Sequence, residues 1–403
     1  MKVLQINTSV NVSAPGRIVS LIGNLLIKNN HESFVAFGQD YRKDLSTPIK
    51  IGNKKDILTH FALTRLFDRH GFGSVKATYE FVRKINKINP DIIHLHNIHG
   101  YYLNIEILFR YLKDTNINIV WTFHDCWPFT GHCSFFDRVN CERWQSECNK
   151  CPLRTGYPAS WIMDRSRSNF IQKRELFTAL KSLVIVTPSE WLADHVKHSF
   201  FRSYQIIVIN NGVDLQSFRP VNPEIASSKY RIPAKRYVLG VANIWSRRKG
   251  YDDFIKLREV LDEKIPIVLV GLSNDQKRKL PKGIIGISHI DTLDDLSSLY
   301  SAAGAFINPT WTDNFPTVNL EALACGTPVI TYDTGGSGES IDGNTGIVVP
   351  RGNIEALKSA VLQIFQNNPN EYKFFCRIRA EALYDAKVRY EDYIRLYEEI
   401  KTC

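Results

Sequence analysis

The chain has 403 residues, of which 44% are hydrophobic and 23% are charged, and its formal net charge is +10. A chain of this length exceeds one ordinary hydrophobic core, so we expect a soluble protein of two domains. No apolar run reaches the roughly 18 residues of a membrane-spanning helix, and the start lacks the apolar region of a signal peptide, so we expect a cytoplasmic location. The positive charge predicts an acidic partner, which is nucleic acid, anionic lipid or a phosphorylated substrate.

Short runs rich in β-branched residues alternate with helical patterns along the first half of the chain. The predicted strands cover residues 2–7, 33–38, 91–97, 118–125, 183–188 and 205–214. Helical patterns cover residues 16–29 and 104–113. This alternation predicts a parallel, doubly wound α/β sheet.

The segment 40–90 is strongly basic. It holds eleven Lys and Arg residues against five Asp and Glu residues, which gives it a net charge of +6. Apolar side chains are interleaved with these charges, as in "ILTHFALTRLF". Two interpretations stay open, a basic amphipathic surface that rests on the anionic inner face of the cell membrane and an ordinary solvated helical face.

A segment rich in Pro, Ser and charge, residues 219–236, is typical of a linker. The strand pattern starts again after it, over residues 237–243, 266–271, 283–289, 304–310 and 327–333. We therefore expect one Rossmann-like domain over residues 1–218, a second over residues 219–384 and an amphipathic helix in residues 385–403. Two such sheets that face a central cleft bind ligands there.

The stretch "WTDNFPTVNLEALACGTPVI", residues 311–330, carries two acidic residues around a predicted helix start. Pro316 suits the first turn of a helix, and Gly326 suits its end. Asp313 then lies just before the helix, and Glu321 lies about one and a half turns inside it. The amino end of a helix attracts a phosphate, and Asp313 can accept hydrogen bonds from sugar hydroxyls beside that phosphate.

Two further turns predict anion binding. In "VANIWSRRKGY", Arg248 and Lys249 stand before the start of a helix, where cations would neutralise a diphosphate and its leaving group. A basic surface loop is the alternative. In "SAPGRIV", Gly16 and Arg17 stand at the first strand-to-helix turn, where the backbone can approach a donor or acceptor phosphate.

Five of the eight cysteines lie within residues 126–151. Disulfides are disfavoured in a reducing cytoplasm, so a structural zinc site and plain reduced thiols are the two alternatives. The four best ligand candidates are Cys133, Cys141, Cys148 and Cys151. His94 and His96 share one face of a predicted strand, but a third metal ligand is not evident beside them.

Taken together, these motifs resemble those of the retaining glycosyltransferases of family 4, which have the GT-B fold of two Rossmann-like domains facing a cleft. The family's motif of two acids separated by seven residues matches Asp313 and Glu321, with an aspartate where the family has its first glutamate. Further matching segments are "NNGVDLQSF" (210–218), "TGGSGESI" (334–341) and "GNTGIVVP" (343–350). Colanic-acid-type and other surface-polysaccharide transferases carry a segment similar to "HDCWPFTGHC", residues 124–133.

The resemblance implies a role for each matching residue. Asp313 would contact the hydroxyls of the donor sugar, and Glu321 would bind the ribose of the nucleotide. The backbone that would hold sugar and diphosphate comprises Asn314, Phe315, Pro316 and Thr317. His124, at a strand end, would lie near the reacting centre. The family's arginine role falls to Arg248, because Ile244 stands at the usual position.

The implied reaction is transfer of a hexosyl group from a nucleotide-sugar, with retention, to a glycan or polyprenyl-linked acceptor for capsule, exopolysaccharide or lipopolysaccharide O-antigen. The chain has no Asp-any-Asp triplet, so we expect no catalytic divalent ion. In the family, the last helix crosses back to brace the first domain. The alternatives are an epimerase or a non-catalytic binder of nucleotide-sugars. A nucleic-acid-binding protein would leave the donor motif unused, so we expect no nucleic-acid partner.

Overall fold

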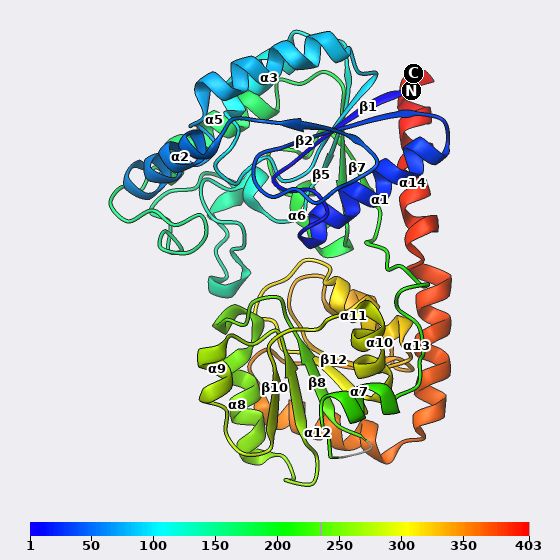
Figure 1. Ribbon diagram of the computed structural model, residues 1–403. Coiled ribbons are helices and arrows are strands. Elements are labelled where there is room, and N and C mark those ends of the chain that lie inside the picture. Colours follow the sequence, from blue (N-terminus) through cyan, green and yellow to red (C-terminus); the bar gives the residue numbers. More distant parts are fainter. Residues whose placement is uncertain (234–235, 403) are drawn as a thin grey trace. The chain divides into compact units, whose positions relative to one another are not determined.

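The structure is a computed structural model that describes residues 1–233 and 236–402, and it divides the chain into two compact α/β units (Figure 1). The first unit contains Met1–Asn210 and the residues from Tyr390 onward, and the second contains Asn211–Arg389. Each unit has its own buried hydrophobic core. Cys403 lies outside the described residues.

The first unit is built on a seven-stranded parallel sheet in the order β3-β2-β1-β4-β5-β6-β7. Its strands are β1 (Lys2–Asn7), β2 (Glu32–Phe37), β3 (Thr47–Lys50), β4 (Ile92–Leu95), β5 (Asn118–Thr122), β6 (Leu183–Thr187) and β7 (Gln205–Val208). Its helices are α1 (Ala14–Lys28), α2 (Lys54–Phe67), α3 (Val75–Ile88), α4 (Ile105–Lys113), α5 (Ser166–Phe177) and α6 (Glu190–Lys197), with short 3-10 turns η1 (Trp127–Phe129), η2 (Asp137–Val139) and η3 (Arg143–Gln145).

The second unit is built on a six-stranded parallel sheet in the order β10-β9-β8-β11-β12-β13. Its strands are β8 (Val238–Val241), β9 (Ile267–Val270), β10 (Ile284–Ile287), β11 (Ala305–Asn308), β12 (Val329–Tyr332) and β13 (Gly346–Val349). Its helices are α7 (Glu224–Lys229), α8 (Tyr251–Val260), α9 (Asn274–Arg278), α10 (Leu293–Ala302), α11 (Thr317–Ala324), α12 (Ile354–Gln366) and α13 (Pro369–Leu383), with 3-10 turns η4 (Arg247–Lys249) and η5 (Gly338–Ser340).

The predicted doubly wound sheets are confirmed, with two strands more than the sequence pattern predicted. The extra strands, β3 and β13, both lie at sheet edges. β3 reads "TPIK", and its proline is tolerated at an edge because an edge strand needs fewer ladder hydrogen bonds. The buried central strands were predictable because helices cover both faces of such a sheet, which makes the strands continuously apolar.

The last helix, α14 (Ala386–Thr402), packs its buried tyrosines against the first unit. The Tyr397 hydroxyl lies 2.6 Å from Nδ1 of His94, and the Thr122 hydroxyl donates to the Tyr393 oxygen at 3.2 Å. The Asn118 side chain donates to the backbone carbonyl of Ile400 at 2.8 Å. These contacts attach the end of the chain to strands β4 and β5.

The boundary between the units differs from the one that the sequence suggested. The structure places it after Asn210, so residues 211–218 belong to the second unit. The polar segment 219–233 contains helix α7, in which fully buried Ala226 donates its backbone N–H to the Ser298 hydroxyl at 3.0 Å. Composition suggested a linker, but Lys229 also forms ion pairs with Asp291 and Asp295, so the segment packs against helix α10. Residues 234 and 235 of the predicted linker lie outside the described residues.

The predicted start of the C-terminal segment at residue 385 also differs from the structure. Asp385 forms a parallel bridge with Val213, and the backbone N–H of Ala386 donates to the Val213 carbonyl at 3.0 Å. Residues 385–389 therefore belong to the second unit. Within residues 1–233 and 236–402, no helix has both the length and the apolar character needed to cross a bilayer.

Candidate functional site

Three loops of the second unit meet at the carboxyl edge of its sheet, because β8, β11 and β12 are neighbouring parallel strands. Gly250, after β8, has φ +76°, and a Cβ there would lie 2.2 Å from the Pro309 carbonyl oxygen. Gly335, after β12, has φ +55°, and a Cβ there would lie 1.7 Å from the Asp313 carbonyl oxygen. The loop after β11 is therefore held between two backbones at distances that only glycine permits.

Asp313 and Lys249 form an ion pair at the centre of these loops. The Lys249 ammonium lies 2.6 Å from Oδ2 of Asp313, and the side chains are 26% and 19% exposed. Burial raises the pKa of Asp313, but the charges of Lys249 and Arg248 outweigh burial, so the pKa is lowered from its ordinary value. Asp313 is thus an anion at neutral pH, held close to two cations.

Arg248 is held by the same loop. Its guanidinium donates to the Thr312 carbonyl at 3.0 Å, and its own carbonyl accepts the Trp311 backbone N–H at 2.8 Å. Ile244, which occupies the family's usual arginine position, is 74% exposed. The structure therefore brings together Arg248, Lys249 and Asp313.

Helix α11 begins at Thr317, one residue later than the prediction placed its first turn. Pro316 is the N-cap residue and supplies no side-chain cap. Phe315 is 3% exposed and packs edge-on against Tyr384, while its carbonyl accepts a hydrogen bond from the Asn211 side chain at 2.8 Å. The helix ends at Ala324, and Gly326 then adopts φ +78°, as predicted. Asn314 precedes Phe315 and is also buried.

Glu321 lies inside α11 and is 7% exposed. The hydroxyl of Tyr300, on α10, donates to its Oε2 at 3.1 Å. This hydrogen bond fixes one carboxylate oxygen, so the orientation of Glu321 is set before any ligand arrives.

Asn319 is a positioning residue that the sequence analysis missed. Its Oδ1 accepts from the Asn308 side chain at 2.9 Å, and its Nδ2 donates to the Ser337 carbonyl at 3.1 Å and the Ser340 hydroxyl at 3.0 Å. These bonds tie β11, α11 and the loop after β12 into one frame. The available signal was a polar amide inside the otherwise apolar helix "TVNLEALA".

In the first unit, His124 follows β5 and belongs to a row of three neighbouring imidazoles. The ring centroids of His94 and His96 are 3.9 Å apart, and those of His96 and His124 are 5.4 Å apart. Nδ1 of His96 lies 3.1 Å from Nε2 of His124. The prediction that His94 and His96 share one face is confirmed, and both nitrogens of each ring have hydrogen-bonding neighbours.

A chain of hydrogen-bonded side chains beside His124 was not predicted. Nε2 of His99 lies 3.0 Å from Oδ2 of Asp125, and its Nδ1 lies 3.1 Å from the Tyr157 hydroxyl. Tyr157 comes from a distant part of the chain, which is why no local spacing indicated these hydrogen bonds. They fix Asp125, the residue next to His124.

Gly16 and Arg17 lie in the first turn of α1, which the Ser13 hydroxyl caps by accepting the Gly16 N–H at 3.2 Å. Gly16 is buried, and a Cβ there would lie 3.0 Å from the Ser9 carbonyl oxygen. Arg17 is exposed. The first turn of α1 therefore lies close to the loop that precedes it, and phosphate binding by Gly16 and Arg17 stays a prediction.

The buried imidazoles predict a loss of stability in acid. Burial lowers the pKa of His60 to about 3 and that of His124 to about 4, against an ordinary value of 6.5. Between about pH 6.5 and pH 4 the unfolded chain therefore binds more protons than the native chain, and each such histidine costs up to about 1.4 kcal/mol per pH unit. Urea unfolding should show stability falling as pH drops from about 7 to 5. A free energy of unfolding that stays level over this range would contradict the assignment of His60 and His124 as neutral. His198→Gln, at an exposed histidine, is the control and should keep the wild-type dependence of stability on pH.

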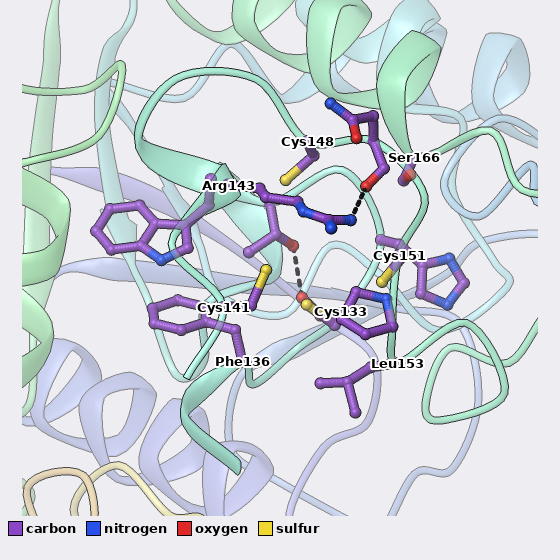
Figure 2. A pocket seen from close by; sticks show the side chains of 13 residues that line it. Cys133, Phe136, Cys141, Arg143, Cys148, Cys151, Leu153 and Ser166 are labelled. Atoms are coloured by element: carbon purple, nitrogen blue, oxygen red, sulfur yellow. Dashed lines mark hydrogen bonds between the residues drawn. The ribbon is translucent and has the colours of Figure 1, made fainter. Parts of the chain in front are cut away.

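The four candidate cysteines line a single pocket of the first unit (Figure 2). All seven cysteines of the described chain are free thiols. As the side chains stand, no three His, Cys, Asp or Glu residues within residues 1–233 and 236–402 form a group that could hold a metal ion.

Both units are parallel and doubly wound, and one of them places a carboxylate and two cations beside the start of a helix. These features define the class of GT-B glycosyltransferases. The family model "Glycosyltransferase Family 4" matches residues 16–217, half of the chain, and the model "Glycosyl transferases group 1" matches residues 235–367. The chain belongs to glycosyltransferase family 4.

Relatives and solved structures agree with this membership. The chain is 26% identical over 372 residues to WcaC of Escherichia coli, a glycosyl transferase assigned to colanic acid biosynthesis. The matched region covers 87% of this chain and 86% of that protein. It is 21% identical to a Campylobacter jejuni N-acetylgalactosaminyltransferase named for a diphospho-undecaprenol acceptor, over 80% of this chain and 85% of that protein.

Two solved structures share the fold over nearly their whole length. Sucrose-phosphate synthase from Thermosynechococcus elongatus superposes with a TM-score of 0.72 at 18% identity, and the superposition covers 99% of each chain. Anabaena HepE in complex with UDP has a TM-score of 0.67 at 14% identity and covers 99% of this chain and all of that chain. The predicted GT-B fold is confirmed.

Proposed function

We propose that this glycosyltransferase transfers a hexosyl group from a nucleotide-sugar, with retention of anomeric configuration, to a glycan or polyprenyl-linked glycan of a bacterial surface polysaccharide. The observation that carries the proposal is the Lys249–Asp313 ion pair, flanked by Arg248, at the amino end of α11. Cations and the start of a helix suit a diphosphate, whereas a carboxylate suits sugar hydroxyls. This site has both kinds of group on neighbouring loops.

Each residue has a distinct task in the proposed reaction. An ammonium group has three N–H donors, so Lys249 can hold Asp313 and a phosphate oxygen at the same time. Arg248 and Lys249 stabilise the charge that grows on the departing nucleoside diphosphate, and Asp313 orients the sugar. Glu321, already fixed by Tyr300, accepts hydrogen bonds from the ribose. His124, which lies in the first unit, is neutral at pH 7 and can take part in hydrogen bonds without carrying a charge.

The acceptor is proposed from the named relatives and from the first unit's surface. WcaC and the undecaprenol-linked transferase of Campylobacter support a lipid-linked glycan, and the HepE complex supports a uridine nucleotide among the donors to test. Leu58, on basic helix α2, is 67% exposed. Trp161 is 61% exposed and lies next to this helix, because its backbone N–H donates to the carbonyl of Arg65 in α2. Such a basic and apolar surface suits the anionic inner face of a membrane.

A thermal-shift panel of UDP-, GDP-, ADP- and dTDP-sugars tests the donor site. A ligand that binds only the native state raises the unfolding midpoint, so we expect one nucleotide to stabilise the wild type. Glu321→Ala should lose most of this shift, because the ribose contact is removed. Glu259→Ala, at an exposed glutamate of α8, is the matched control and should keep the shift.

Two results would overturn the donor-site proposal. One is a panel in which no nucleotide stabilises the wild type although nucleic acid does. The other is an equal shift in the wild type and in Glu321→Ala, which would locate the nucleotide elsewhere.

A further inference from the structure

The segment between β5 and α5 is held together by very little regular structure. It runs from residue 123 to residue 165 and contains only the 3-10 turns η1, η2 and η3. Loops of more than about 15 residues without secondary structure are uncommon in compact domains unless something else orders them. The segment also carries His124, close to its start, and the four candidate cysteines, so whatever orders the segment also positions His124.

The four sulfur atoms face a common space within this segment, as Figure 2 shows for Cys133, Cys141, Cys148 and Cys151. Cys133 and Cys151 are in hydrogen-bond contact with each other through their sulfurs. Residues separated by up to eighteen positions are thus brought to one pocket.

Backbone amides point at two of these sulfurs. The Gly131 N–H hydrogen-bonds to the sulfur of Cys148, and the Leu153 N–H hydrogen-bonds to the sulfur of Cys151. Gly131 is required for this approach, because a Cβ there would lie 2.8 Å from Cβ of Cys148 and 2.0 Å from the Ser166 carbonyl oxygen.

The wall of the same pocket carries a buried nitrogen that the protein leaves unsatisfied. His132 lines the pocket, and its Nδ1 lies 2.6 Å from Oδ1 of Asp68, with both side chains fully buried. Among the described residues, its Nε2 has no hydrogen-bond partner. Buried polar atoms are nearly always paired, so this orphan indicates that something the chain does not supply completes the pocket.

Two basic side chains contact the cysteine segment. The Arg143 guanidinium lines the pocket and donates to the Asn149 and Lys150 carbonyls, which fixes the turn between Cys148 and Cys151. Nζ of buried Lys173 donates to the Trp127 and Thr130 carbonyls at 2.8 and 3.0 Å, and burial lowers its pKa to about 7. A negatively charged centre in the pocket would compensate the charge of Arg143.

We propose that this pocket is a structural zinc site whose ligands are the thiolates of Cys133, Cys141, Cys148 and Cys151. Four sulfur ligands in a tetrahedron are a preferred environment for Zn²⁺, and the bound centre carries two negative charges. On binding, each thiol forms a zinc–sulfur bond and releases its proton to solvent, four protons in all. The sulfurs converge on the ion by rotation about χ1, which moves a cysteine sulfur while its backbone stays in place.

The zinc site is independent of the proposed reaction and has a structural role. Cys126, close to His124, donates its backbone N–H to the Ser134 carbonyl at 2.8 Å, which connects the strand end to the cysteine loop. A zinc ion would therefore fix the loop that carries His124 and Asp125. It makes no contact with the substrate in this proposal.

Metal analysis of the full-length protein, purified without chelators from zinc-supplemented cells, tests the site. We expect about one zinc per chain, and Cys148→Ser should weaken zinc binding at least about tenfold. Cys126→Ser is the matched control, because this buried cysteine lies in the same segment but outside the pocket lining, and it should retain the ion.

Cobalt substitution of the wild type keeps the test decisive if Cys148→Ser does not fold. Co²⁺ in the proposed site should give the visible bands of a tetrahedral ion and strong sulfur-to-metal charge-transfer absorption. Wild-type protein that binds neither zinc nor cobalt, and whose four pocket thiols all react with a thiol reagent, would overturn the proposal. So would a zinc content that survives in Cys148→Ser and is lost in Cys126→Ser.

Discussion

Lys249→Met should lower the rate of sugar transfer by about 10²- to 10³-fold, the usual effect of removing one preorganised group that stabilises transition-state charge. Lys249 lies 2.6 Å from Asp313 at the start of α11, where the departing diphosphate is proposed to bind. Because the charge on the phosphate grows as the sugar leaves, the loss should fall mainly on kcat. Steady-state kinetics with the donor identified by the nucleotide panel measure this effect.

Lys264→Met is the matched control, since Lys264 is an exposed lysine of the same unit. It should leave kcat and KM within about twofold of the wild type, because exposed surface charges contribute little. If Lys249→Met kept the wild-type kcat and only changed the unfolding midpoint, Lys249 would be a structural partner of Asp313 and the charge-stabilising role would be wrong.

Gly250→Ala should sharply reduce donor binding and cost about 1–3 kcal/mol of stability or more. The residue has φ +76°, and the new Cβ would lie 2.2 Å from the Pro309 carbonyl oxygen, which is backbone and cannot turn aside. The loop that carries Arg248 and Lys249 must then move away from the loop that carries Asp313. Urea unfolding and the nucleotide-dependent thermal shift report the two effects separately.

Gly343→Ala provides the control for Gly250→Ala, because a Cβ at Gly343 meets no atom within 4 Å. It should be neutral or slightly stabilising, since alanine restricts the unfolded chain. Wild-type donor binding by Gly250→Ala would show that the close contact of the two loops is not needed for the site.

The sequence predicted the sheets and the loop around Asp313 because both leave local signals. Buried parallel strands are continuously apolar, and the loop around Asp313 is framed by Pro316 and Gly326, whose backbone preferences act within a few residues. Helix α7 was missed because its contacts are tertiary: Ala226 is buried against Ser298, and Lys229 pairs with Asp291 and Asp295, which composition does not reveal.

The positioning contacts of the site could not be predicted for a different reason. Asn319 joins three segments, and Tyr157 reaches His99 from 58 positions away, so their roles depend on tertiary packing. The Lys249–Asp313 pair likewise spans 64 positions, and only the resemblance to family 4 placed both residues in one site. Residue type and spacing thus indicate which chemistry is available, while the partners that orient it emerge only with the fold.

Sugar transfer with retention of configuration is tested most directly by analysing the product of the reaction. The protein is incubated with the nucleotide-sugar selected by the panel and with membranes that contain polyprenyl-linked glycans, and the anomeric configuration of the product is determined by NMR. We expect acceptor-dependent transfer with the donor's configuration retained, and little transfer by Lys249→Met. Conversion of the nucleotide-sugar into its epimer without an acceptor, or a product of inverted configuration, would contradict it.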